Sequence, residues 1–197
     1  VSMKPARLSA ICLLFLFLHA PLHAEPAHEH VLNWGGLGFA SDKFQYPSAV
    51  AVSPTGDVYV ADQMNHRWTA FTPEGIDFYQ RGGFGTGLGQ FKEPQGIAVS
   101  KLGHVYVSDT RNHRIQKYPW GTGVPEAWGS FGSANGEFNL PLGLTPLGNG
   151  NLYVCDSGND RIQQLTSAGV YVNSFGSPGS GPGEFDGPSG IATGREG

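Results

Sequence analysis

Short apolar runs alternate with glycine-containing turns along most of the chain. The clearest runs are Val58–Ala61, Val105–Ser108 and Leu152–Cys155, which are largely apolar on both faces. Such runs are typical of strands that are covered by a neighbouring sheet on each side. A glycine turn precedes each run, and no segment keeps the 3.6-residue periodicity of an amphipathic helix. The pattern predicts an all-β fold and excludes a helical solenoid.

The pattern repeats with a constant step of 47 residues, as Asp62, Asp109 and Asp156 show, without insertion or deletion. Each unit predicts four short strands. The first follows a proline, the second is the apolar run, the third begins at an arginine, and a weaker fourth is clearest at Val170–Phe175. Four antiparallel strands at this spacing form the blade of a β-propeller. The expected blades are about 44–90, 91–137 and 138–184, with a truncated fourth from 185.

The first residues have the features of an export signal rather than of a folded element. Lys4 and Arg7 form a basic start, and Leu8–Leu18 is an apolar run about half as long as a membrane-spanning helix requires. Ala24 offers a small residue for cleavage, so we expect a secreted or periplasmic protein without a membrane anchor. The predicted division of the chain is a signal peptide at 1–24, an N-terminal lead-in at 25–33 and a partial propeller at 34–197.

The charge balance and the cysteines narrow the class of protein further. The formal net charge is −4, and the basic residues after the leader are scattered along the sequence. Nucleic-acid binding usually needs a clustered basic surface, so no nucleic-acid partner is expected. Cleavage after Ala24 would leave Cys155 as the only cysteine, which excludes an internal disulfide. The fold is therefore expected to hold by packing.

The second unit closely resembles the NHL repeat. The resemblance is carried by Pro94–Val99, at the start of the blade, and by Val105–Gln116, which contains Ser-Asp-Thr-Arg-Asn-His-Arg. The connector Phe175–Phe185 is similar to the ending of an NHL blade, and the resemblance extends from Trp34 to about Ala192. NHL propellers usually have six blades, which at this step need roughly 280 residues. The resemblance therefore implies that about three and a half blades are present here.

The recurring Asp-x-x-Asn-x-Arg motif could suggest acid–base catalysis. A catalytic site is needed once per molecule, however, and this motif occurs in every unit, so we interpret it as structural. The aspartate and asparagine are expected to hold the turn after the second strand, and the arginine is expected to pair with a nearby carboxylate. The motif residues are Asp62, Asn65, Arg67, Asp109, Asn112, Arg114, Asp156, Asn159 and Arg161.

The five histidines that follow the leader do not indicate a metal site. His28 and His30 precede the first unit, and His104 is expected at the opposite end of the blade from the other two. His66 and His113 occupy a position that is usually an exposed loop residue in NHL repeats. Peptide-amidating lyases of the NHL type carry a zinc-binding histidine directly after the first-strand proline. That position holds Ser48, Gln95, Leu142 and Ser189 here, so no metal and no other cofactor is expected in the visible blades.

Residues that differ between units at equivalent exposed places are candidates for recognition. The loops between the second and third strands are expected to share one rim with the long connectors, where propellers commonly bind partners. Tolerated variation of solvent-facing residues explains the same differences equally well. The rim candidates are Gln63, Met64, His66, Thr110, Arg111, His113, Ser157 and Asp160.

We therefore expect a non-catalytic binding or scaffold module that holds a protein, a peptide or a small-molecule ligand on one propeller rim. The alternative is a secreted lyase or hydrolase of the peptidyl-amidating-lyase type, with catalytic residues partly in blades beyond this sequence. A third hypothesis is RNA or ubiquitin-pathway adaptor work, as in animal NHL proteins. The signal peptide, the acidic balance and the lack of a second domain disfavour it.

Overall fold

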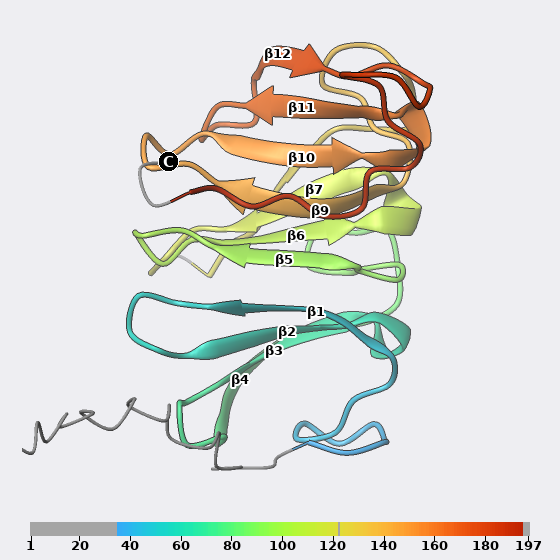
Figure 1. The fold of residues 1–197 in the computed structure, drawn as a ribbon. Coiled ribbons are helices and arrows are strands. Elements are labelled where there is room, and N and C mark those ends of the chain that lie inside the picture. The colour runs from blue at the N-terminus through green and yellow to red at the C-terminus, as the bar shows by residue number, and fades with distance from the viewer. Residues whose placement is uncertain (1–34, 122, 195–197) are drawn as a thin grey trace, which may run out of the picture. The chain divides into compact units, whose positions relative to one another are not determined.

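The computed structural model describes residues 35–121 and 123–194. The signal peptide expected at 1–24 and the lead-in expected at 25–33 lie outside these residues. The described chain contains three four-stranded antiparallel sheets, each formed by strands that are consecutive in sequence (Figure 1). Within 35–121 and 123–194, no helix is long and apolar enough to cross a membrane.

Each sheet has the same element order. The first contains β1 (Pro47–Val52), β2 (Val58–Asp62), β3 (Arg67–Phe71) and β4 (Asp77–Gly82). The second contains β5 (Gly96–Val99), β6 (Val105–Asp109), β7 (Arg114–Tyr118) and β8 (Glu126–Trp128). The third contains β9 (Pro141–Pro146), β10 (Leu152–Asp156), β11 (Arg161–Leu165) and β12 (Tyr171–Phe175). Short 3-10 turns join the second and third strands: η1 (Gln63–Asn65), η2 (Thr110–Asn112) and η3 (Ser157–Asn159).

The strands lie close to where the sequence predicts them, with one exception after the third sheet. The expected first strand of a fourth unit, beginning at Gly190, is not formed within 186–194. Its neighbour Ser189 accepts a backbone hydrogen bond from Gly143 on β9, at 3.0 Å. The described chain offers this segment no second strand with which to continue a ladder, so the prediction of a strand at Gly190 is wrong here.

The core lies between the faces of consecutive sheets rather than inside one sheet. Trp68 of β3 packs against Tyr118 of β7, and their rings meet edge to face at 5.2 Å. The first strands β1, β5 and β9 lie next to one another (Figure 1). A Cβ added to Gly96 on β5 would collide with the carbonyl oxygen of Leu142 on β9, so glycine permits this close approach.

The second and third connectors each end in a phenylalanine that packs between the connector and the sheets. Phe91 and Phe138 are fully buried, and each forms an isolated parallel bridge with a phenylalanine seven positions earlier, Phe84 or Phe131. The burial of a whole aromatic side chain stabilises a fold by roughly 1.5–3 kcal/mol. The two buried rings therefore hold these connectors against the sheets. The connectors also carry the candidate site.

Candidate functional site

The connectors and the turns after the second strands are held together at one end of the sheets (Figure 1). In the second sheet, the side-chain amide of Asn112 donates to the carbonyl oxygen of Gly85 in the preceding connector, at 2.8 Å. Asn65 and Asn159 make the equivalent bond at 2.9 Å. We call the surface formed by the connectors 35–44, 82–91 and 129–138 together with η1–η3 the connector rim.

The aspartate that ends each second strand is completely buried at this rim. Oδ1 of Asp109 accepts a hydrogen bond from the backbone N–H of Lys92 at 2.8 Å. Its Oδ2 accepts from Nε of Arg114 at 2.7 Å, which makes a buried ion pair. Asp62 and Asp156 form the same two bonds in their own sheets. Both carboxylate oxygens are therefore occupied by groups of the protein itself.

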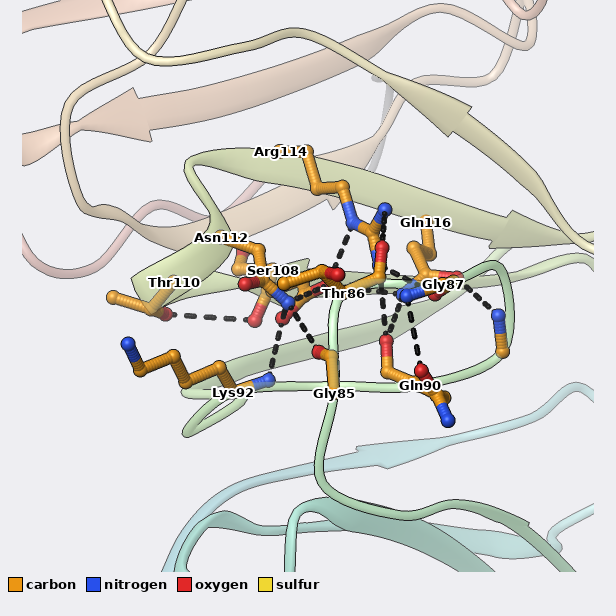
Figure 2. A network of polar contacts seen from close by, with 12 residues as sticks. Gly85, Thr86, Gly87, Gln90, Lys92, Ser108, Thr110, Asn112, Arg114 and Gln116 are labelled. Atoms are coloured by element: carbon orange, nitrogen blue, oxygen red, sulfur yellow. Dashed lines mark hydrogen bonds and ion pairs between the residues drawn. The ribbon is translucent and has the colours of Figure 1, made fainter.

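The side chain of the motif arginine holds the connector by hydrogen bonds to the backbone carbonyl oxygens of the connector (Figure 2). Arg114 donates to the carbonyl oxygens of Thr86 and Gly87, each at 2.7 Å, and to that of Gln90 at 3.1 Å. The arginines of the other two motifs bond connector carbonyls in the same manner. A charge-assisted network of this kind immobilises a loop. The contacts account for the recurrence of the motif in every sheet.

Two glutamines that sequence reasoning missed complete this network. Gln116 donates from Nε2 to Oδ2 of Asp109 at 3.0 Å and to the carbonyl oxygen of Gln90 at 2.6 Å (Figure 2). Gln163 makes the equivalent pair of bonds in the third sheet. The signal in the sequence is a glutamine two residues after the arginine. It is absent from the first unit, where Thr69 is buried with its hydroxyl unpartnered.

The fourth residue of each loop reaches into the next sheet. His66, His113 and Asp160 all adopt the left-handed backbone conformation, with φ of 52°, 54° and 52°. Nδ1 of His66 accepts from the backbone N–H of Glu93 at 3.1 Å, and that of His113 accepts from Leu140 at 3.1 Å. Oδ1 of Asp160 accepts in the same way, at 2.8 Å. These side chains differ in type but perform one structural task, and the half-buried histidines are not the free loop residues that the sequence suggested.

Two further rim candidates also bond the following segment. The hydroxyl of Thr110 donates to the carbonyl oxygen of Pro141 at 2.9 Å, and that of Ser157 donates to Pro188 at 2.5 Å. Both residues are buried. Their hydroxyls join neighbouring units and do not face solvent.

The remaining rim candidates are open to a partner. Met64 is 42% exposed, and Gln63 beside it is partly exposed. Arg111 forms an ion pair with Glu93 at 3.1 Å, and its side chain is 54% exposed. An exposed pair of this kind adds little stability, so its charges can be redirected to a ligand at small cost.

Exposed aromatic side chains lie beside these candidates and were not anticipated. Phe84 and Phe131 stand at equivalent places in two connectors and are 67% and 69% exposed. Each ring packs on the histidine of the neighbouring loop: Phe84 on His66 at 5.1 Å, and Phe131 on His113 at 4.8 Å between centroids. The histidines thus support two aromatic rings that face solvent.

Comparison with known families identifies the repeat. The family model for the NHL repeat matches residues 44–67 and 91–118, which contain the first two Asp-x-x-Asn-x-Arg motifs. Two segments of the chain, one in each of the first two units, therefore match the NHL repeat. No curated protein sequence matches it.

Solved structures that are similar to this chain show the fold. A protein of unknown function from Bacteroides thetaiotaomicron is 22% identical and has a TM-score of 0.59 over 80% of this chain. Hydrazine synthase from Kuenenia stuttgartiensis is 16% identical, with a TM-score of 0.57 over 79%. A catalytically inactive virginiamycin B lyase from Staphylococcus aureus, determined with quinupristin, is 18% identical, with a TM-score of 0.56 over 74%. The chain has a β-propeller fold, and it spans 42–44% of the length of these three structures.

Two histidines of the NHL repeats are held in the neutral form. Burial, followed by the charges of Arg111 and Lys92, lowers the pKa of His113. Burial, followed by the charge of Lys117, lowers the pKa of His104, whose Nδ1 accepts from the backbone N–H of Trp120 at 2.9 Å. A neutral ring that accepts at Nδ1 carries its proton on Nε2. Both imidazoles therefore serve as hydrogen-bond acceptors near pH 7.

The placement of these groups bears on metal binding as well. Within residues 35–121 and 123–194, no three histidine, cysteine, aspartate or glutamate side chains gather closely enough to hold a metal ion. Nδ1 of His66 and of His113 is already engaged by a backbone N–H of the next unit.

Proposed function

We propose that this propeller is an extracytoplasmic binding module that holds a protein or peptide on its connector rim and carries out no chemistry there. The observation that supports this most directly is the pair of exposed rings, Phe84 and Phe131, each supported by a histidine that is itself fixed to the next sheet. Aromatic rings held in place in advance lose little conformational freedom on binding, and such residues dominate the energy of many interfaces.

The charges of the rim add selectivity to this apolar pair. Arg111 and Glu93 form an exposed ion pair, and Met64 exposes a flexible apolar side chain. An apolar centre with a polar edge is the composition expected of a surface that binds another protein. The buried part of the rim, with its Asp–Arg pairs, keeps the connectors rigid and takes no part in the contact.

Selection from a displayed peptide library tests the proposal while the natural ligand is unidentified. Peptides selected on the full chain should bind the double variant Phe84→Ser, Phe131→Ser at least about tenfold more weakly, a loss of about 1.4 kcal/mol. The matched control is Trp120→Ser, which removes a 71% exposed aromatic from the opposite rim. The rim is the wrong surface if the selected peptides respond to Trp120→Ser and ignore the phenylalanine pair.

A secreted lyase is the second candidate, because virginiamycin B lyase is among the similar structures. The likeness at 18% identity carries the fold alone. Incubating the chain with quinupristin and measuring the intact compound by mass spectrometry separates the two candidates. We expect no loss of quinupristin; turnover would favour the lyase.

The extracytoplasmic location rests on the leader expected at 1–24. When the full chain is expressed with its own leader, sequencing of the exported protein should give Glu25 as the first residue. Retention of Met3 would contradict export by this leader.

A further inference from the structure

A cleft opens between the first and second sheets, at the end opposite the connector rim. Its volume is about 490 Å³, which is within the range of small-molecule sites in proteins. The turns that lead to β6 and follow β7 close one side of it, at Gly103 and Pro119. Aromatic side chains from both sheets form most of its lining: Tyr59, Trp68, Phe78, Tyr79, Tyr118 and Trp120.

The equivalent space between the second and third sheets is filled. Trp128 of β8 occupies it, with its ring 6.0 Å from that of Tyr106 and so close to Gly169 that a Cβ there would collide with it. Arg81 holds the place of Trp128 in the first sheet, since Arg81 pairs with Trp68 as Trp128 pairs with Ile115. The cleft is therefore a feature of this one interface and not a requirement of the repeat.

Two residues that line the cleft bury polar atoms that lie near each other without forming a well-aligned hydrogen bond. They are Nε1 of Trp68, in a residue 2% exposed, and Oη of Tyr118, in a residue 5% exposed. At the equivalent interface, Ile115 of the second sheet stands in the place of Trp68, and Leu165 of the third sheet stands in the place of Tyr118. Neither side chain has a polar atom. A buried donor without a well-formed hydrogen bond is unfavourable, so a ligand that accepts from these groups would be stabilised by them.

Trp68, Tyr118 and Arg81 each offer the cleft a hydrogen-bond donor. An indole N–H can only donate, and burial raises the pKa of Tyr118 to about 12, so its hydroxyl keeps its proton. The guanidinium of Arg81 lies 4.3 Å from the ring centroid of Tyr79, and it has no carboxylate within ion-pair distance among the described residues. Phe78 and Trp120 keep 51% and 71% of their surface exposed at the mouth. Aromatic walls with donors and one cation complement an aromatic molecule that carries a negative charge.

We propose that this cleft binds a planar aromatic carboxylate, with its ring against Phe78 and Trp120 and its carboxylate on Arg81. The ring replaces the tryptophan that fills the next interface. The carboxylate supplies the acceptor that the donors of the cleft lack and neutralises the cation of Arg81.

Calorimetric titration of the full chain with naphthoate, and with its uncharged counterpart naphthamide, tests the proposal. Naphthoate should bind, and naphthamide should bind at least about tenfold more weakly. Arg81→Gln should weaken naphthoate about tenfold and leave naphthamide unchanged, because it removes only the charge. Arg81→Trp should abolish binding of both, because it restores the side chain that fills the neighbouring interface.

Trp120→Ser is a variant of the cleft that should fold normally. Trp120 is largely exposed, and the third unit has serine, Ser167, at the equivalent position. This variant should keep its melting temperature and lose about tenfold in naphthoate affinity. Phe131→Ser, at the other end of the sheets, is the control that should bind naphthoate normally. Absence of naphthoate binding at millimolar concentration, equal binding of naphthamide, or binding that Arg81→Trp leaves intact would each overturn the proposal.

Discussion

Nδ1 of His66 accepts a hydrogen bond from the backbone N–H of Glu93, which lies 27 residues later and just before β5 of the next sheet. The same sequence separation joins His113 to Leu140 and Asp160 to Gly187. These bonds join each unit to the segment that follows it at the connector rim. The residue type at this position varies between units. In all three units, however, the residue has a left-handed backbone and its side chain accepts a hydrogen bond.

Removing this acceptor should loosen the joint between sheets. We expect His113→Ala to lower the free energy of unfolding by about 1 kcal/mol, because it leaves the part-buried N–H of Leu140 without its side-chain partner. His113→Asp is the matched control, because Asp160 performs the same task in the third unit, and it should cost less than His113→Ala. Urea denaturation followed by circular dichroism measures both. Equal losses would show that the acceptor does not matter.

The lowered pKa values of two histidines should make the free energy of unfolding depend on pH. The folded-state pKa of His113 and that of His104 lie below 6.5, so below that pH the unfolded chain binds protons that the folded chain does not. We expect stability to be constant from pH 8 to 7 and to fall as the pH drops below about 6.5. In the double variant His104→Asn, His113→Asn this part of the fall should disappear, since asparagine also accepts but does not titrate. Urea midpoints across this range measure the effect. A midpoint that rises on acidification would contradict it.

The half-buried and the exposed residue of a single turn should respond differently. Asn112→Ala removes the bonds to Gly85 and Asp109 and should lower stability by about 1 kcal/mol. Arg111→Ala, one residue earlier and half exposed, should change stability by no more than about 0.5 kcal/mol. Thermal melting of both variants decides the comparison. Similar losses would mean that the exposed Arg111–Glu93 pair holds the turn as firmly as the asparagine.

The sequence predicts the repeated part of this molecule well, because each repeated residue answers a local demand. The buried second strands, the third strands that begin at Arg67, Arg114 and Arg161, and the all-β propeller follow directly from the period. Contacts between units are different, because they join residues 27 or more positions apart. The bond from His66 to Glu93 and the cleft beside Arg81 depend on how one sheet faces the next, which no periodicity shows.

The rim candidates illustrate this limit. Selecting residues by their variation found Met64 and Arg111, which are exposed, but it also selected Thr110 and Ser157, which are buried and bonded to the next unit. Phe131 was not among the candidates, because these were taken only from the loops between the second and third strands and Phe131 lies in a connector. Its 69% exposure follows from the path of the connector and not from its residue type.

One cross-strand pair distinguishes the first unit from the other two. Gln116 faces Ala127 and Gln163 faces Ser174, whereas Thr69 faces Gln80. In the first unit, the large polar side chain of this pair is therefore on β4 and not on the third strand, as it is in the other two units. There, Oε1 of Gln80 accepts from Arg67 at 3.1 Å, and the buried hydroxyl of Thr69 has no partner.

Exchanging both residues should restore the arrangement of the second unit. Thr69→Gln alone adds volume at a fully buried position beside Gln80, so it should destabilise the chain by about 1–3 kcal/mol. Gln80→Ala alone removes an acceptor from Arg67 and should cost about 1 kcal/mol. In the double variant the new glutamine has room to reach Asp62, as Gln116 reaches Asp109, and stability should equal or exceed that of the parent. A double-mutant cycle by urea denaturation measures the coupling, which should be favourable by at least about 1 kcal/mol. Additive losses would show that the connector of the first unit does not accept this network.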